Sequence, residues 1–156
     1  MTDPKTLTSV AEFHKVFQHP ILEKPTIPSE KRSALRVSLI AEELKELEEA
    51  IQNNDLVEVA DALCDIQYVL AGAVLEFGLK DKFNELFEEV QRSNMSKACQ
   101  SIEEAEATIA HYKTSKDVDS YYKEVDGLFL VFRTEDNKTL KSINYSPADL
   151  KSIIEK

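Results

Sequence analysis

Six of the nine carboxylate side chains in AEELKELEEAIQNNDLVEVADALCDIQYVL, the stretch from residue 41 to residue 70, form two groups at helical spacing. A short polar break at residues 53–55 divides them into two groups, and these are Glu42, Glu43 and Glu46, then Glu58, Asp61 and Asp65. At about 100° per residue, the first group spans roughly 100° of a helix surface and the second roughly 60°. Each group therefore lies on one side of its helix.

Convergence of the two groups would create an oxygen-rich site for a divalent cation. If the helices pack antiparallel across the break, the first group can face Glu58 and Asp61, so that five side chains converge. Such sites suit Mg²⁺, with Mn²⁺ as a possible substitute, and usually take substrate phosphates as further ligands. The cluster lacks the Cys and His that zinc prefers, and no histidine lies in the Glu-x-x-His motif of di-iron bundles.

The ordinary alternative is a solvated polar face. It explains the first group equally well, because an amphipathic helix must have such a face and Glu favours helices. The second group differs, since apolar residues surround it on nearly the whole circumference of its helix, which we expect to be buried. No Lys or Arg occurs between Leu47 and Leu79. Buried carboxylates there would need another partner, such as a metal ion.

The elements that must position these residues are mainly helical. Periodicity, proline positions and capping residues predict helices over residues 9–18, from Ser29 or Ser33 to about 51, over 55–77, 80–92 and 102–113, and a β-hairpin or small appendage around 135–138. No linker-like segment interrupts the chain. We therefore expect a single domain over residues 1–156, with a core at about 8–98 and an appendage at about 99–156.

The composition excludes several function classes. The net charge of −10 disfavours binding to a nucleic-acid polymer, and no apolar run approaches the roughly 18 residues needed to cross a membrane. The opening MTDPKTLTSVAEF lacks the pattern of a secretory signal, so we expect a cytoplasmic location. Cys64 lies in an apolar run and is expected to be a small buried side chain.

The segments EELKE (42–46) and EVAD (58–61) resemble the EExxE…ExxD signature of the MazG-like, all-α nucleoside triphosphate pyrophosphohydrolases, which include phosphoribosyl-ATP pyrophosphohydrolase-like proteins. EFHKVFQHPI, RSNMSK and INYSPADL are similar to a subgroup, whereas residues 99–141 match no known part of the family. The resemblance implies an all-α fold, namely an oligomeric four-helix MazG-like bundle, here with a small C-terminal helix and β-hairpin appendage.

The resemblance also implies an activity and a set of site residues. The activity is Mg²⁺-dependent cleavage of a nucleoside triphosphate between the α and β phosphates, in a housecleaning or pool-balancing role. The implied catalytic metal ligands are Glu42, Glu43, Glu46, Glu58 and Asp61. The expected substrate-binding residues are Asp65, Arg92, Asn94, Lys97, Asn144 and Tyr145. For Asp65, a structural salt bridge is an equal alternative.

Two other readings remain open. Within the enzyme class, the substrate could be phosphoribosyl-ATP, although RSNMSK and NYSPADL favour the broader nucleotide-cleaving subgroup. Outside it, the chain could be a non-catalytic helical module whose acidic face binds a basic partner. The expected partners of the enzyme are its nucleotide substrate and further copies of the chain, as a homodimer or homotetramer.

Overall fold

The computed structural model describes residues 5–156. The prediction that the N-terminus carries no secretory signal concerns a segment whose first four residues lie outside that range. The chain forms two compact units that divide between Phe83 and Asn84. The described residues form six helices and one two-stranded sheet, which confirms a mostly helical protein compatible with the all-α prediction. In this range, every helix is too short or too polar to cross a membrane.

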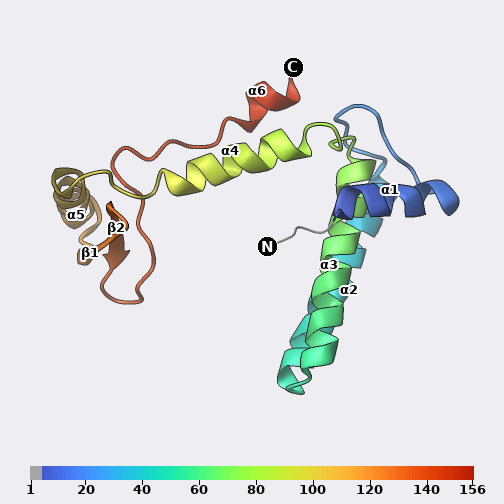
Figure 1. The fold of residues 1–156 in the computed structure, drawn as a ribbon, viewed down its shortest axis with the longest axis horizontal. Helices are drawn as coiled ribbons and strands as arrows, with labels where there is room; N and C mark the ends of the chain where they lie inside the picture. The colour runs from blue at the N-terminus through green and yellow to red at the C-terminus, as the bar shows by residue number, and fades with distance from the viewer. Residues whose placement is uncertain (1–4) are drawn as a thin grey trace. The chain divides into compact units, whose positions relative to one another are not determined.

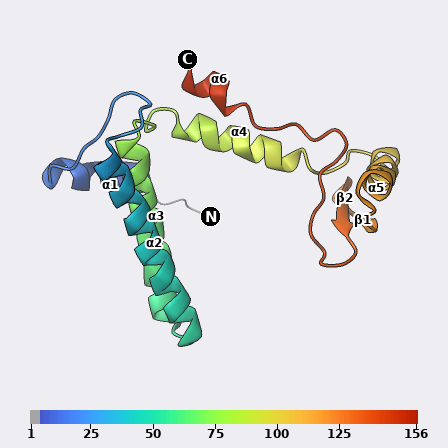
Figure 2. The ribbon, with the colours of Figure 1, turned by 180° about the vertical axis from the view of Figure 1, so that it is seen from behind.

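The first unit is built on a pair of antiparallel helices. Helices α2 (Glu30–Gln52) and α3 (Leu56–Glu76) lie side by side in both views (Figures 1 and 2). Asp55 begins α3, because its side chain accepts hydrogen bonds from the Val57 and Glu58 amides at 3.0 and 3.2 Å. The short helix α1 (Thr6–Val16) packs on α3 through Val10, Ala71 and Leu75.

Helix α3 ends where its sequence requires a left-handed residue. Gly78 has φ +67°, and the amides of Gly78 and Leu79 donate to the carbonyls of Leu75 and Val74 at 3.2 and 3.0 Å. This is the Schellman arrangement, which satisfies the last carbonyls of a helix. The α1–α2 connection also reaches this end, since the Leu22 amide donates to Leu75 and the Thr26 amide to Phe77. The chain thereby fixes α1 against α2 and α3.

The prediction that α3 is largely buried is wrong for the single chain. Its N-terminal half is open: Leu56 is 79% exposed and Leu63 52% exposed, and Cys64 is exposed as well. Glu58, Asp61 and Asp65 are also exposed. The reason is geometric, because α2 covers one side of this half while α1 reaches only the other end of α3. An apolar surface therefore remains uncovered within the unit.

The second unit contains α4 (Phe83–Met95) from its second residue onward, α5 (Ile102–Lys116), strands β1 (Ser120–Val125) and β2 (Leu128–Arg133), and α6 (Leu150–Ile154). Its core comprises Cys99, Ala105, Val131 and Leu140. The expected hairpin exists, but its predicted turn at residues 135–138 is wrong. The two strands instead meet at Asp126 and Gly127, both with positive φ (52° and 78°), as tight hairpin turns require.

Candidate functional site

The carboxylates of α2 and α3 converge on Glu43. Glu43 is half-buried, whereas Glu42, Glu46, Asp61 and Asp65 are exposed. Partial burial raises the pKa of the Glu43 carboxyl, and the nearby charges of Asp65, Glu46, Glu42 and Asp61 raise it further. The antiparallel pairing thus brings four of the five predicted metal ligands into one electrostatic neighbourhood, together with Asp65.

Glu58, the fifth predicted ligand, is not among the charges that act on Glu43. Among residues 5–156, no three His, Cys, Asp or Glu side chains are close enough together to hold a metal ion. Basic side chains do not balance the cluster either: Lys45, on the same helix, pairs with Glu49 at 3.2 Å instead. Carboxylates are the ligands that hard divalent cations such as Mg²⁺ prefer. Because these side chains do not lie close enough together to hold one, binding of Mg²⁺ here stays a prediction.

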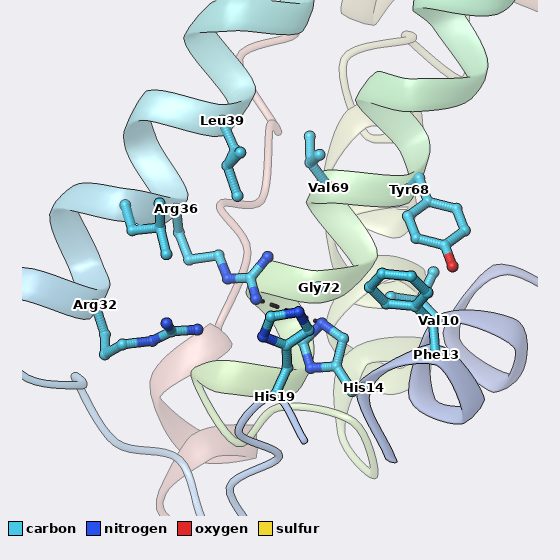
Figure 3. A pocket seen from close by; sticks show the side chains of 11 residues that line it. Val10, Phe13, His14, His19, Arg32, Arg36, Leu39, Tyr68, Val69 and Gly72 are labelled. Carbon is cyan, nitrogen blue, oxygen red and sulfur yellow. Dashed lines mark hydrogen bonds between the residues drawn. The ribbon is translucent and has the colours of Figure 1, made fainter. Parts of the chain in front are cut away.

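A cavity of about 230 Å³ lies between α1, α2 and α3 (Figure 3). Its aromatic wall comes mainly from α1 and the segment after it, since the rings of Phe13 and His19 stack at 5.7 Å and Tyr68 of α3 meets Phe13 edge-on at the same distance. Other lining residues are Val10, His14, Arg32, Leu35, Arg36, Leu39, Val69 and Gly72. The cavity is therefore apolar and aromatic with a basic side.

A buried ion cluster supports that basic side. Glu76 of α3 is 1% exposed, and both Arg32 and Arg36 donate to its carboxylate. Burial alone would raise the pKa of Glu76, but the two arginines outweigh it and hold the pKa below its ordinary value. Gly72 makes room for this cluster, because a Cβ there would lie 2.6 Å from Nη1 of Arg36.

His14 is buried beside the cluster. Its Nδ1–H donates to the Pro20 carbonyl at 2.9 Å, so Nε2 carries the lone pair and faces Nη2 of Arg36 at 3.4 Å. Burial lowers the pKa of His14, and the positive charge of Arg36 lowers it further. His14 is therefore held neutral near neutral pH.

Sequence reasoning missed Arg32, Arg36 and Glu76. A signal was present, because Glu76 is a single acid in the apolar run from residue 69 to 77, and the two arginines occupy positions i and i+4 of α2. A buried acid of this kind needs a basic partner. The pairing joins residues 40 and 44 positions apart, so only the fold could identify it.

The remaining predicted substrate-binding residues lie together in the second unit. Arg92 donates to Glu89 at 2.7 and 2.8 Å and to the Pro147 carbonyl at 3.1 Å. The Tyr145 hydroxyl lies 3.1 Å from that of Ser93. RSNMSK and NYSPADL are thus neighbours in space, consistent with the segment that runs beside α4 in Figure 1.

Two further contacts complete this second set. Lys97 donates to the side chain of Asn94 at 2.8 Å, and the Asn144 amide donates to Ser142 at 2.9 Å. The substrate-binding role of Arg92, Asn94, Lys97, Asn144 and Tyr145 stays a prediction, because each of these contacts also serves local structure. Arg92 in particular is already bonded to Glu89, whose pKa it lowers to about 2 together with the Asp149 amide.

Comparison with known proteins adds a family relationship. The family model for phosphoribosyl-ATP pyrophosphohydrolase matches residues 10–94, more than half of the chain. The matched range contains the carboxylate cluster and every residue that lines the cavity. An uncharacterised protein of Acanthamoeba polyphaga mimivirus is 24% identical over an aligned length of 237 residues, which covers 94% of this chain and 94% of that protein.

Proposed function

The chain belongs to the phosphoribosyl-ATP pyrophosphohydrolase family, within the MazG-like superfamily, and from this premise we propose that it hydrolyses nucleoside triphosphates to nucleoside monophosphates and pyrophosphate with the help of Mg²⁺. The observation that carries the proposal is the group of carboxylates around Glu43; Lys45, the nearby basic residue on α2, pairs with Glu49 instead. A surface of this charge repels a bare triphosphate, whereas it attracts the cations that accompany one.

The proposed roles come from the family resemblance, and four of the five side chains, all except Glu58, act on one another's charge around Glu43. Glu42, Glu43 and Glu46 would hold Mg²⁺ from α2, and Glu58 and Asp61 would hold it from α3. Bound Mg²⁺ would offset the phosphate charge and lower the pKa of the attacking water. The charge of Asp65 raises the pKa of Glu43, so the two carboxylates are close, and Asp65 would accept hydrogen bonds from water in the same site. Arg92, Asn94, Lys97, Asn144 and Tyr145 belong to the second unit, and their proposed role as phosphate donors rests on the family resemblance alone.

The products distinguish this proposal from its competitors. We expect incubation with a panel of ribo- and deoxyribonucleoside triphosphates to release monophosphate and pyrophosphate, with at least about a 100-fold loss of rate in EDTA. Chromatography of the nucleotides and a pyrophosphate-specific assay measure both products. Release of diphosphate and orthophosphate, or full activity in EDTA, would contradict the proposal. If phosphoribosyl-ATP is cleaved faster than any nucleoside triphosphate, then it is the preferred substrate, and the proposed type of reaction is unchanged.

We also propose that the enzyme works as a homodimer or a larger homo-oligomer. The observation that supports this is the apolar surface of the first unit, where side chains from α2 and α3 are between 39% and 79% exposed. These are Val37, Leu44, Ile51, Leu56, Val57, Leu63 and Leu70. Contiguous apolar surface on this scale marks an interaction site in soluble proteins.

The oligomer can be tested by mass. We expect light scattering after size exclusion to give at least twice the 17.7 kDa of one chain. Leu63→Glu should lower that mass, because it places a charge in the centre of the apolar surface. Ile27→Glu is the matched control, since Ile27 is 82% exposed but lies outside α2 and α3. A monomeric wild type would contradict the proposal.

A further inference from the structure

The hairpin of β1 and β2 has two outer edges, and they differ (Figures 1 and 2). The β2 edge is paired within the unit, since Phe129 and Cys99 exchange two hydrogen bonds at 2.9 Å. The Val131 carbonyl accepts a third from the Leu140 amide at 2.8 Å. Helix α5 packs on a face of this sheet, because its Ala105 shares the buried core with Val131. The other outer edge belongs to β1.

The outer edge of β1 carries unpaired backbone groups. In an antiparallel pair, successive residues alternate between bonding to the neighbouring strand and facing away from it. The Thr134 amide donates to the Asp119 carbonyl at 2.9 Å, which sets this alternation. Tyr121 and Lys123 therefore bond to β2, and the residues between them face outward. These are Ser120, Tyr122 and Glu124. Among residues 5–156, no backbone group bonds to their amides and carbonyls on that side.

This edge lacks the usual barriers to a further strand. Proline, a bulge or a charge directed to the edge prevents such pairing in many sheets. β1 contains no proline, and its register with β2 continues without a bulge over its whole length. The charge of Lys123 is directed elsewhere, because its Nζ lies over the rings of Tyr121 and Phe132, 5.6 and 5.9 Å from their centres. A strand of suitable sequence can therefore pair with β1.

We propose that the β1 edge pairs antiparallel with the β1 edge of a second copy of this chain, which joins the two hairpins into one four-stranded sheet. A two-fold axis relates the copies, so one residue of β1 faces itself across the axis. With Tyr122 on the axis, Ser120 of one copy faces Glu124 of the other. Lys123 of one copy then faces Tyr121 of the other. All the outward amides and carbonyls find partners, in about six hydrogen bonds.

The charges on β1 favour this register over its neighbours. An axis at Lys123 or at Glu124 would place two like charges opposite each other, which destabilises a strand pair. An axis at Tyr121 would place Glu124 opposite Val118, whose amide already bonds within its own chain at 3.2 Å. With the axis at Tyr122, no like charges face each other. The Lys123 ammonium then meets an aromatic ring of the second copy, an arrangement that it already has in its own chain.

This interface is separate from the one proposed for α2 and α3. β1 belongs to the second unit and lies outside residues 10–94, the range that matches the family model. The pairing of β1 is also independent of the proposed reaction. Two different two-fold interfaces on one chain join more than two copies. The β1 edge therefore predicts an assembly larger than the dimer that the helices alone would form.

A pair of cysteines tests the register. Tyr121→Cys and Lys123→Cys together would place each new thiol opposite one of the second copy, about 4.5 Å apart between Cα atoms, which suits a disulfide. The background carries Cys64→Ala, because Cys64 is exposed. Mild oxidation should give at least about tenfold more linked dimer than either single cysteine variant, as gels without reductant measure. Equal amounts would overturn the proposal, and so would the absence of linked dimer, which is expected if the edge binds a strand of another protein.

Glu124→Pro tests the backbone pairing. Proline removes the outward amide of residue 124, which the β1–β2 ladder does not use. This variant should lower the mass in light scattering at least about twofold. Glu124→Ala is the matched control, since it removes the carboxylate but keeps the amide, and its mass should equal that of the wild type. An unchanged mass in Glu124→Pro, or the same loss in Glu124→Ala, would overturn the proposal. If Glu124→Pro does not fold by circular dichroism, the cysteine pair decides.

Leu63→Glu separates the two interfaces. It changes the apolar surface of α2 and α3, so it should lower the mass but leave the amount of linked dimer in the cysteine pair unchanged. Loss of the link in this variant would show that the contact depends on the helices, and it would overturn a separate β1 interface.

Discussion

Asp61→Asn and Glu43→Gln should each lower kcat/KM by at least about 100-fold, because each removes a charged metal ligand and electrostatic stabilisation by the metal is worth several kcal/mol. Asp61 is one of the charges that raise the pKa of Glu43. The melting temperature should not fall together with the activity. Without Mg²⁺, each variant should melt at the same temperature as the wild type or higher, since a like-charge repulsion has been removed.

Mg²⁺ should then distinguish the variants from the wild type. A ligand at 100 times its Kd stabilises the folded state by about 2.7 kcal/mol, so wild-type Tm should rise with Mg²⁺ and the variants should lose that rise. Glu48→Gln is the control, because Glu48 is exposed on α2 and contacts Gln52 rather than the cluster. A wild type that Mg²⁺ does not stabilise, with both variants neutral, would favour the non-catalytic acidic module.

The sequence predicted the helices of the first unit well because their ends are marked by local chemistry. Asp55 caps α3 and Gly78 ends it, and both act within a few residues of themselves. The hairpin turn was misplaced although its signal was also local. Asp126-Gly127 is a typical two-residue turn, but the prediction placed the turn at the longer polar run of residues 135–138. The chain does reverse direction at that run, since Phe132 and Thr139 form an antiparallel bridge.

The burial of α3 could not be predicted from its composition. Apolar residues around the whole circumference of a helix indicate that it packs against other elements, but they do not show whether those elements belong to the same chain. Here Leu56 and Leu63 stay open, so the argument that Glu58 and Asp61 are buried acids fails for a single chain. The nearness of Asp61 and Asp65 to Glu43 does not depend on burial, because it comes from the pairing of α2 with α3. The role of these carboxylates as metal ligands stays a prediction.

Glu76→Ala should be the most destabilising of these substitutions, by about 3–5 kcal/mol in the free energy of unfolding, since it leaves buried Arg36 without its carboxylate. Glu23→Ala is the matched control. Glu23 also pairs with a basic residue, Lys80, at 2.8 Å, but its side chain is 74% exposed, so its loss should cost less than about 1 kcal/mol. Chemical denaturation measures both, and equal costs would contradict the account of the buried cluster.

The contribution of Glu76 to the free energy of unfolding should also depend on pH, and the direction of this dependence follows from its two arginine partners. Its pKa is lower in the folded chain than the ordinary value of 4.5, because the ion pairs with Arg32 and Arg36 outweigh the cost of burial. The unfolded chain therefore takes up the proton first, and the stabilisation is present above pH 4.5 and lost as pH falls through the folded pKa. Glu76→Gln should remove this part of the acid sensitivity, so the stability difference from the wild type should narrow below that pH.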